Sequence, residues 1–288
     1  MLTRIDHAMI CVPDLGRSVE TYTRLGFSIY PGGVHPGHGT HNAIAFFEED
    51  YLELMSVNPV ERQLASAGLV DFLARGGGFR YVVVQSDDLA ADVAAMRARG
   101  VDVGDPTEGG RRTPGGQELR WKVASLGAGN PLPLIFIQHL TPLAERRRQV
   151  PWAGEHPNGA LRLERAYITV PDVAKAAGVY ARVLGMPVPK TYRGTVIMAD
   201  MAVFEMGPTG LAVGQSYAPG PAAEALARQG PGPFQVLYRT RSMDAAVRWM
   251  IDHRMPPPVR GTRNTGEQAI LVEPANAGGV YIGFVGPA

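Results

Sequence analysis

VPDLGRSVETYTRLGF at residues 12–27 returns as VPDVAKAAGVYARVLGM at residues 170–186 in this chain of 288 residues. In each copy, Val-Pro-Asp ends an apolar run and the aspartate is typical of a helix N-cap. Apolar residues then follow at helical spacing, and a glycine ends the helix. The apolar runs at 4–12 and 167–170 predict a strand before each helix. The two copies therefore predict a repeated strand–helix unit.

Three short β-like segments follow the first helix, near 28–30, 41–47 and 51–57, which completes a βαβββ unit. Weaker copies of the same order occupy 80–140 and 234–285. We therefore expect an α+β fold of four βαβββ units that pair into two halves. The predicted domains are an N-terminal one over 1–142 (units 1–75 and 78–142), a Pro-rich linker over 143–160, and a C-terminal one over 161–288 (units 161–230 and 231–288).

Composition excludes several classes of partner. There are 28 Lys and Arg residues against 27 Asp and Glu, a net charge of +1, so the chain lacks the excess charge of nucleic-acid and anionic-membrane binders. Cys11 is the single cysteine, and the N-terminal residues resemble neither a signal peptide nor a membrane span. We expect a cytoplasmic protein whose partner is a small molecule or, as a homodimer, a second copy of itself.

Two polar residues interrupt strands that are otherwise apolar. His7 is in phase with Met9 and Cys11, so it faces the interior, and Glu53 stands in the middle of Tyr-Leu-Glu-Leu-Met. A buried unpaired carboxylate is costly, and a divalent metal would satisfy both residues. A core histidine held by hydrogen bonds is the alternative.

With these residues, the chain resembles the vicinal oxygen chelate superfamily. GGVHPGHGTHNAIAFFEEDYLEL at 32–54, LRW at 119–121, PLIFIQH at 133–139 and HPNGALRL at 156–163 resemble its glyoxalase-like branch. The resemblance implies two open barrels, each built from two βαβββ units. It also implies a divalent metal (Zn, Ni, Mn or Fe) in a barrel cavity, with ligands from the first and fourth strands of each unit.

The resemblance assigns residues in the N-terminal barrel. His7 and Glu53 match the ligands of the first unit. In the second unit, Tyr81 matches the first-strand position and Gln138, beside His139, the fourth-strand position. The implied metal ligands are thus His7, Glu53 and Gln138, and Tyr81 and His139 are the candidates for proton transfer.

No ligand set can be assembled in the C-terminal half. Its first-strand positions fall on Arg165 and on Pro233 or Phe234, and its fourth-strand positions fall near Val213 and Gly283. We therefore expect the second barrel to be structural, or at most a pocket without a metal.

Two further segments offer substrate contacts. A loop over 32–42 could close over the cavity mouth, with His35, His41 and Asn42 as contacts, or it could merely shape a turn. The segment 107–121 adds Arg112, suited to a carboxylate or phosphate, and Trp121, a flat apolar wall. Solvated arginines are the alternative there, and they are the preferred interpretation of the run at 146–148.

Two functions follow from these residues. The first is a metal-dependent enzyme of lyase or isomerase type, which stabilises an enolate of a small oxygen-chelating substrate. The second is a non-catalytic protein that binds a small molecule, as bleomycin-resistance relatives bind antibiotics. A ring-cleaving dioxygenase is a further alternative, but such relatives usually carry their ligands in the C-terminal barrel.

Overall fold

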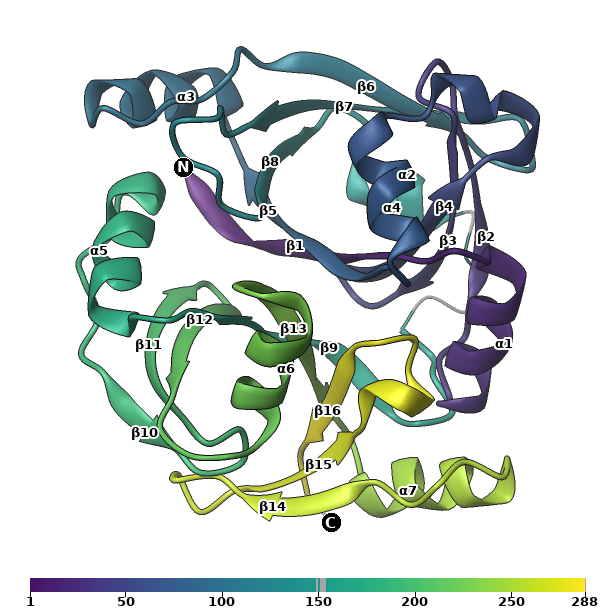
Figure 1. Cartoon of the computed structure of the whole chain (residues 1–288). Helices are drawn as coiled ribbons and strands as arrows, with labels where there is room; N and C mark the ends of the chain where they lie inside the picture. The colour runs from purple at the N-terminus through teal and green to yellow at the C-terminus, as the bar shows by residue number, and fades with distance from the viewer. Residues whose placement is uncertain (149, 151–153, 288) are drawn as a thin grey trace.

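The chain folds into two eight-stranded sheets that lie side by side; some helices flank the sheets and others lie over their openings (Figure 1). The computed structural model describes residues 1–148, 150 and 154–287. The predicted α+β fold of four βαβββ units is confirmed. Within the described part of the chain, no helix is long and apolar enough to cross a membrane.

The first sheet is a closed barrel in the strand order β1-β4-β3-β2-β6-β7-β8-β5. Its strands are β1 (Leu2–Cys11), β2 (Tyr30–His35), β3 (Thr40–Phe46), β4 (Tyr51–Val57), β5 (Gly78–Ser86), β6 (Thr107–Arg112), β7 (Glu118–Ser125) and β8 (Leu134–His139). The pairing of Val34 with Arg112 joins β2 to β6 and closes the sheet that the resemblance describes as open.

The second sheet stays open, with β10 and β14 at its edges, in the order β10-β11-β12-β9-β13-β16-β15-β14. Its strands are β9 (Ala160–Thr169), β10 (Tyr192–Gly194), β11 (Ala199–Met206), β12 (Thr209–Ser216), β13 (Gly232–Thr240), β14 (Val259–Thr262), β15 (Gln268–Val272) and β16 (Tyr281–Val285).

The helices of the first three units begin at aspartates that the sequence repeat predicts, and that of the fourth begins at a serine. Asp14 accepts a hydrogen bond from the Arg17 amide at 3.0 Å, and Asp88, Asp172 and Ser242 cap the other three units in the same way. These helices are α1 (Leu15–Arg24), α3 (Leu89–Ala98), α5 (Val173–Leu184) and α7 (Met243–Asp252). The remaining helices are α2 (Ala67–Ala74), α4 (Leu143–Arg147), α6 (Pro221–Gln229) and the short 3-10 turns η1 (Pro59–Leu64) and η2 (Pro274–Asn276).

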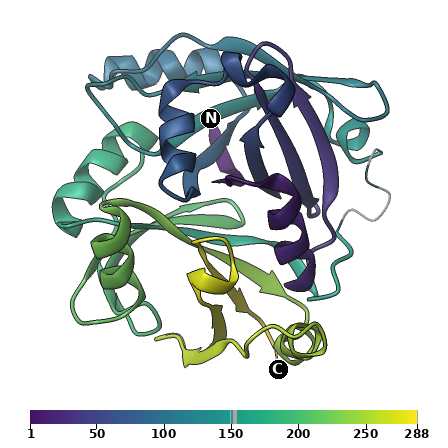
Figure 2. The ribbon, with the colours of Figure 1, turned by 45° about the vertical axis from the view of Figure 1, so that its right-hand side comes forward.

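The two sheets lie against each other (Figure 2), and a shared apolar core joins them. Phe27 follows α1 and packs against Phe47 of the first half and against Tyr238 and Phe284 of the second. Hydrogen bonds cross the same boundary, such as the one from the Ile5 amide to the Thr209 hydroxyl at 2.7 Å. The two sheets are therefore packed as one body.

The segment 32–42 is mostly a β-hairpin and not a loop over the cavity mouth. β2 and β3 pair from Tyr30 opposite Ile44 to His35 opposite Thr40, and only 36–39 form the turn between them. In the predicted linker over 143–160, the structure describes α4 and the residues after 153. Residues 149 and 151–153 of that linker, and residue 288, lie outside the described residues.

Candidate active site

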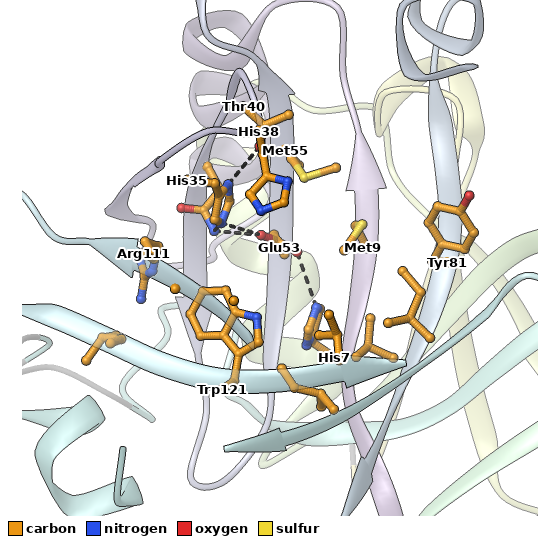
Figure 3. A pocket seen from close by; sticks show the side chains of 18 of the residues that line it. His7, Met9, His35, His38, Thr40, Glu53, Met55, Tyr81, Arg111 and Trp121 are labelled. Atoms are coloured by element: carbon orange, nitrogen blue, oxygen red, sulfur yellow. Dashed lines mark hydrogen bonds and ion pairs between the residues drawn. The ribbon is translucent and has the colours of Figure 1, made fainter. Parts of the chain in front are cut away.

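The first barrel encloses a cavity of about 390 Å³. Its polar lining residues include His7, Glu53 and His35 (Figure 3). Apolar residues, among them Trp121 and Ile137, line it as well. A mostly apolar hollow with a few converging polar groups is typical of a small-molecule site.

His7 lies between two carboxylates. Its Nε2 is 3.2 Å from Oε2 of Glu53, its Nδ1 is 2.7 Å from Oδ2 of Asp6, and its ring stacks on Tyr51. Burial alone would lower the pKa of His7, but the hydrogen bonds to Asp6 and Glu53 outweigh burial and raise that pKa to about 9. The two carboxylates therefore favour the protonated form of His7, and a metal bound at Nε2 would displace that proton.

Glu53 stays ionised although it is buried. Burial would raise its pKa, but the hydrogen bond and charge of His7 outweigh burial and lower the pKa to about 2. Asn42 donates from Nδ2 to the other carboxylate oxygen, Oε1, at 2.6 Å. Both oxygens are thus held in place, and the carboxylate faces the cavity.

Asp6 is a site residue that the sequence pattern misses. Strict strand alternation places it on the face opposite His7, but the register between β1 and β5 shifts between Ile5 and His7. The resulting bulge leaves Asp6 fully buried, where it also accepts a hydrogen bond from His139 Nε2 at 2.8 Å. Burial would raise the pKa of Asp6, but the two histidines hold it well below its usual range. The sequence does carry one signal for Asp6, since it is a charged residue within the otherwise apolar strand β1.

His35 lies beside Glu53, with its Nε2 4.0 Å from Glu53 Oε1. Its Nδ1 is 2.9 Å from the Thr40 hydroxyl. Burial lowers the pKa of His35 to about 4, so its imidazole is neutral at pH 7. Trp121 approaches the same ring edge-on. The predicted substrate contacts His35, Asn42 and Trp121 all line the cavity.

The second unit contributes no ligand at the matching positions. β1 and β5 are the first strands of their units and run antiparallel, with His7 opposite Val83 and Met9 opposite Tyr81. Tyr81 therefore corresponds to His7, as the sequence count predicts, and Val83 corresponds to Met9. Because Met9 pairs with Glu53 and Val83 pairs with Ile135, Ile135 corresponds to Glu53. Tyr81, Ile135 and His139 all line the cavity.

Gln138 is wrongly predicted as a metal ligand. Alternation along β8 turns its side chain outward, where its amide accepts from the Leu89 amide at 3.1 Å and donates to the Asp87 carbonyl at 3.0 Å. Gln138 therefore anchors the start of α3, outside the barrel.

Two predicted substrate contacts also face away from the cavity. His41 alternates outward between the inward-facing Thr40 and Asn42. Arg112 is exposed and forms an ion pair with Glu118 at 2.9 Å. Its neighbour Arg111 faces inward and lines the cavity.

Arg146 corrects the expectation of a solvated run at 146–148. It belongs to the short helix α4, is buried and lines the cavity. Its helix packs beside the barrel through Leu143, which contacts the apolar cluster of Ile44 and Phe46. A long-range contact of this kind leaves no local signal in the sequence.

The donor chemistry partly fits a divalent metal. Two ligands of one ion at 2.0–2.2 Å each lie roughly 3–4 Å apart, and His7 Nε2 and Glu53 Oε2 meet this requirement at 3.2 Å. The carboxylate of Asp6 on His7 Nδ1 is the partner that metal-binding histidines usually have. Among the described residues, however, no group of three or more His, Cys, Asp or Glu side chains is arranged to hold a metal ion. The described residues thus bring together two potential metal ligands at the cavity wall and no complete ligand set.

The family model described as a glyoxalase-like domain matches residues 5–184, more than half of the chain. The fold is similar to the crystal structure of a hypothetical protein from Staphylococcus aureus (14% identity, TM-score 0.66, covering 98% of this chain and 99% of that chain). It is also similar to a mutant of 4-hydroxymandelate synthase from Streptomyces coelicolor (15% identity, TM-score 0.69, covering 99% and 92%).

A fusion protein of a xylose isomerase-like TIM barrel and 4-hydroxyphenylpyruvate dioxygenase shares the fold as well (11% identity, TM-score 0.59, covering 99% of this chain and 49% of that chain). No curated protein matches the chain. At these identities the solved structures show the fold alone, whereas the family model identifies the family. The chain belongs to the glyoxalase-like family of the vicinal oxygen chelate superfamily.

Proposed function

We propose that the chain is a metal-dependent enzyme of lyase or isomerase type, which acts on a small oxygen-chelating substrate in the first barrel. The observation that supports this most directly is the convergence of His7 Nε2 and Glu53 Oε2, 3.2 Å apart, at the cavity wall. His7 and Glu53 would hold the cation. A divalent cation held there supplies Lewis-acid stabilisation of negative charge on two neighbouring substrate oxygens.

The residues behind this pair fix its orientation. Asp6 accepts from His7 Nδ1, which directs Nε2 toward the cavity. Asn42 holds Oε1 of Glu53, which leaves Oε2 directed at His7. The cation site is thus largely organised before substrate enters.

His139 is suited to accept a proton from the substrate. Its Nε2 donates to the ionised Asp6, and its Nδ1 has no hydrogen-bond partner among the described residues. His139 lines the cavity, so in the tautomer that Asp6 selects, Nδ1 is the atom that can take up a proton. Tyr81 shares the cavity wall and is the second candidate for proton transfer.

Metal binding tests this proposal. Wild type, His7→Ala and Glu53→Ala would be stripped with chelator, reconstituted with Mn²⁺ or Zn²⁺, desalted and assayed by elemental analysis and calorimetry. We expect about one ion per chain in wild type and an affinity at least tenfold lower in both variants. Gln138→Ala is the matched control and is expected to bind like wild type. Wild type without stoichiometric metal would contradict the proposal.

A binding protein without catalytic activity is the second candidate. It is favoured by Tyr81 and Ile135, which stand where a complete site would carry ligands. It is also favoured by the pairing of His7 with two carboxylates, which satisfies all three groups without a metal. If reconstitution fails while small molecules still bind in the first barrel, this second candidate is the function.

A further inference from the structure

Two buried arginines in the cavity wall have neither an ion-pair nor a hydrogen-bond partner among the described residues. Arg111 on β6 and Arg146 on α4 are each only 8% exposed, and both line the cavity. Neither forms an ion pair or a hydrogen bond with any residue that the structure describes, and Nη1 of Arg111 and Nε of Arg146 are fully buried. By contrast, the exposed Arg112 and Arg120 on the same hairpin pair with Glu118 and Glu108.

The two cations line the same cavity as the proposed metal pair. Burial lowers the pKa of Arg111, and the charge of Arg146 lowers it further, whereas Tyr51 and Glu53 oppose that shift. Both arginines also act on the pKa of Tyr51, whose ring stacks on His7. Gly32 leaves room for Arg111, because a Cβ at that position would be 2.7 Å from Nη1.

Charge balance around the cavity is incomplete. The cavity-lining carboxylates Glu53 and Glu108 are both engaged by other residues, so neither pairs with Arg111 or Arg146. A buried cation without a counterion is costly. An anionic group of a ligand would supply the missing counterion.

We propose that Arg111 and Arg146 bind the carboxylate of a carboxylic acid, whose apolar part lies against Trp121 and the other apolar lining residues. A guanidinium group donates two parallel hydrogen bonds to a carboxylate, which a buried arginine without another acceptor is free to do. This names the substrate class of the proposed enzyme and depends on that proposal for the reaction, but not for binding.

Binding of three probes of similar shape tests the subsite: phenylacetate, the uncharged phenylacetamide and phenyl phosphate. Calorimetry with metal-free wild type is expected to show phenylacetate binding at least about tenfold more tightly than phenylacetamide and than phenyl phosphate. Arg111→Met and Arg146→Met are each expected to lose this preference and to bind the amide as wild type does. Arg112→Met is the control and is expected to keep it.

Equal affinity of wild type for acid and amide, or no detectable binding of the acid, would overturn the proposal. Tighter binding of phenyl phosphate than of phenylacetate would overturn the choice of a carboxylate. Stability gives a second readout, because an arginine kept for a ligand should not be needed for folding. Arg111→Met is expected to melt at or above the wild-type temperature without ligand, and a lower melting temperature would show a structural role instead.

The ligand-binding experiment can fail or succeed independently of the metal-binding experiment. If metal binding fails but the acid preference follows Arg111 and Arg146, the chain is a carboxylate-binding protein, and the subsite stands without the enzyme. If metal binds but the acid preference is missing, the enzyme proposal stands and the subsite is wrong.

Discussion

The two sheets share one plan and differ in what fills them. The first encloses about 390 Å³, whereas the pocket in the second holds about 30 Å³. In the second sheet, apolar side chains such as Tyr167, Phe234 and Leu237 occupy the interior. The cavity is therefore a property of the inward-facing residues and not of the βαβββ plan itself.

Strand register shows where the two sheets diverge. The counterpart of His7 is Arg165, which pairs with Glu205 at 2.7 Å, and the counterpart of Tyr51 is Gly210. Sequence spacing places the counterpart of Glu53 near Val213, but the register moves it to Ala212. The second sheet thus keeps no part of the His–Glu pair.

The fourth unit continues this pattern. Sequence spacing places its counterpart of His7 at Pro233 or Phe234, whereas the pairing of Gln235 with Tyr167 moves that position to Gln235. Gly283, which pairs with Leu237, stands where the first unit has Glu53. The four units therefore share one backbone plan, and each carries different residues at the two positions that His7 and Glu53 occupy in the first unit.

The largest expected effect tests whether the two sheets are one folding unit. Phe27→Ala removes the ring that contacts both sheets and is expected to lower the free energy of unfolding by about 4 kcal/mol. Urea denaturation followed by circular dichroism should still show a single transition, because the core is shared. Val188→Ala, at a site 59% exposed, is the control and should change stability by less than about 0.5 kcal/mol. Two separate transitions in Phe27→Ala would mean that the sheets unfold independently.

A smaller effect compares His7 with its counterpart Arg165. His7→Ala leaves Asp6 and Glu53 as buried carboxylates that share no cation, and we expect a loss of about 3 kcal/mol in the metal-free protein. Arg165→Ala leaves Glu205, whose side chain is 62% exposed, so the lost pair itself should cost less than about 1 kcal/mol. Denaturant titrations at pH 7 measure both. Equal losses would mean that the His7 pair is no more important to folding than an ion pair with one exposed partner.

The linker histidine His156 gives the third effect, through pH. Its Nδ1 accepts from the Ser28 amide at 3.0 Å, and burial against Phe27 and Phe47 lowers its pKa to about 4. The unfolded chain takes up a proton below about pH 6.5 and the folded chain resists it, so stability is lost as pH falls from 6.5 to 4. We expect His156 to cost about 2 kcal/mol between pH 8 and pH 5.

His156→Asn keeps an acceptor for Ser28 and removes the titrating group. Its free energy of unfolding should therefore fall less than that of wild type between pH 8 and pH 5. Parallel pH curves for the two proteins would show that His156 does not cause the acid sensitivity.

The smallest effect extends the comparison to the second unit. Ile135→Glu places a carboxylate at the counterpart of Glu53 and is expected to raise affinity for Mn²⁺ by about tenfold. Ala212→Glu, the same change in the second sheet, should create no site, because Arg165 and not a histidine stands at the position of His7. Calorimetry measures both. Weaker binding in Ile135→Glu would mean that the second unit does not reach the His7–Glu53 pair.

The repeated sequence predicted most of the fold, because Val-Pro-Asp and the following glycine act locally: the aspartate caps the helix at its start and the glycine permits the turn at its end. His7 and Glu53 were predicted for a similar reason, since an alternating strand fixes which face a residue takes. These features depend on neighbours in sequence.

The rest of the site depends on contacts between distant segments. Asp6 turns inward only because β1 is bulged against β5, and Arg146 reaches the cavity only because α4 packs beside the barrel. Gln138 and Arg112 were each assigned to the wrong face, one residue away from His139 and Arg111, which line the cavity. An error of one residue in register reverses the face of a strand residue.

The first barrel is closed by the pairing of β2 with β6 at Val34 and Arg112 alone. Gly33 beside it has a φ of +133°, and a Cβ there would lie 2.0 Å from the carbonyl oxygen of Arg112, so only glycine lets the two strands meet. This seam adjoins Arg111, one residue from the proposed carboxylate subsite. Because one residue pair joins these strands, their separation would open the barrel beside Arg111 and leave the strand pairs that β1 shares with β4 and β5 intact.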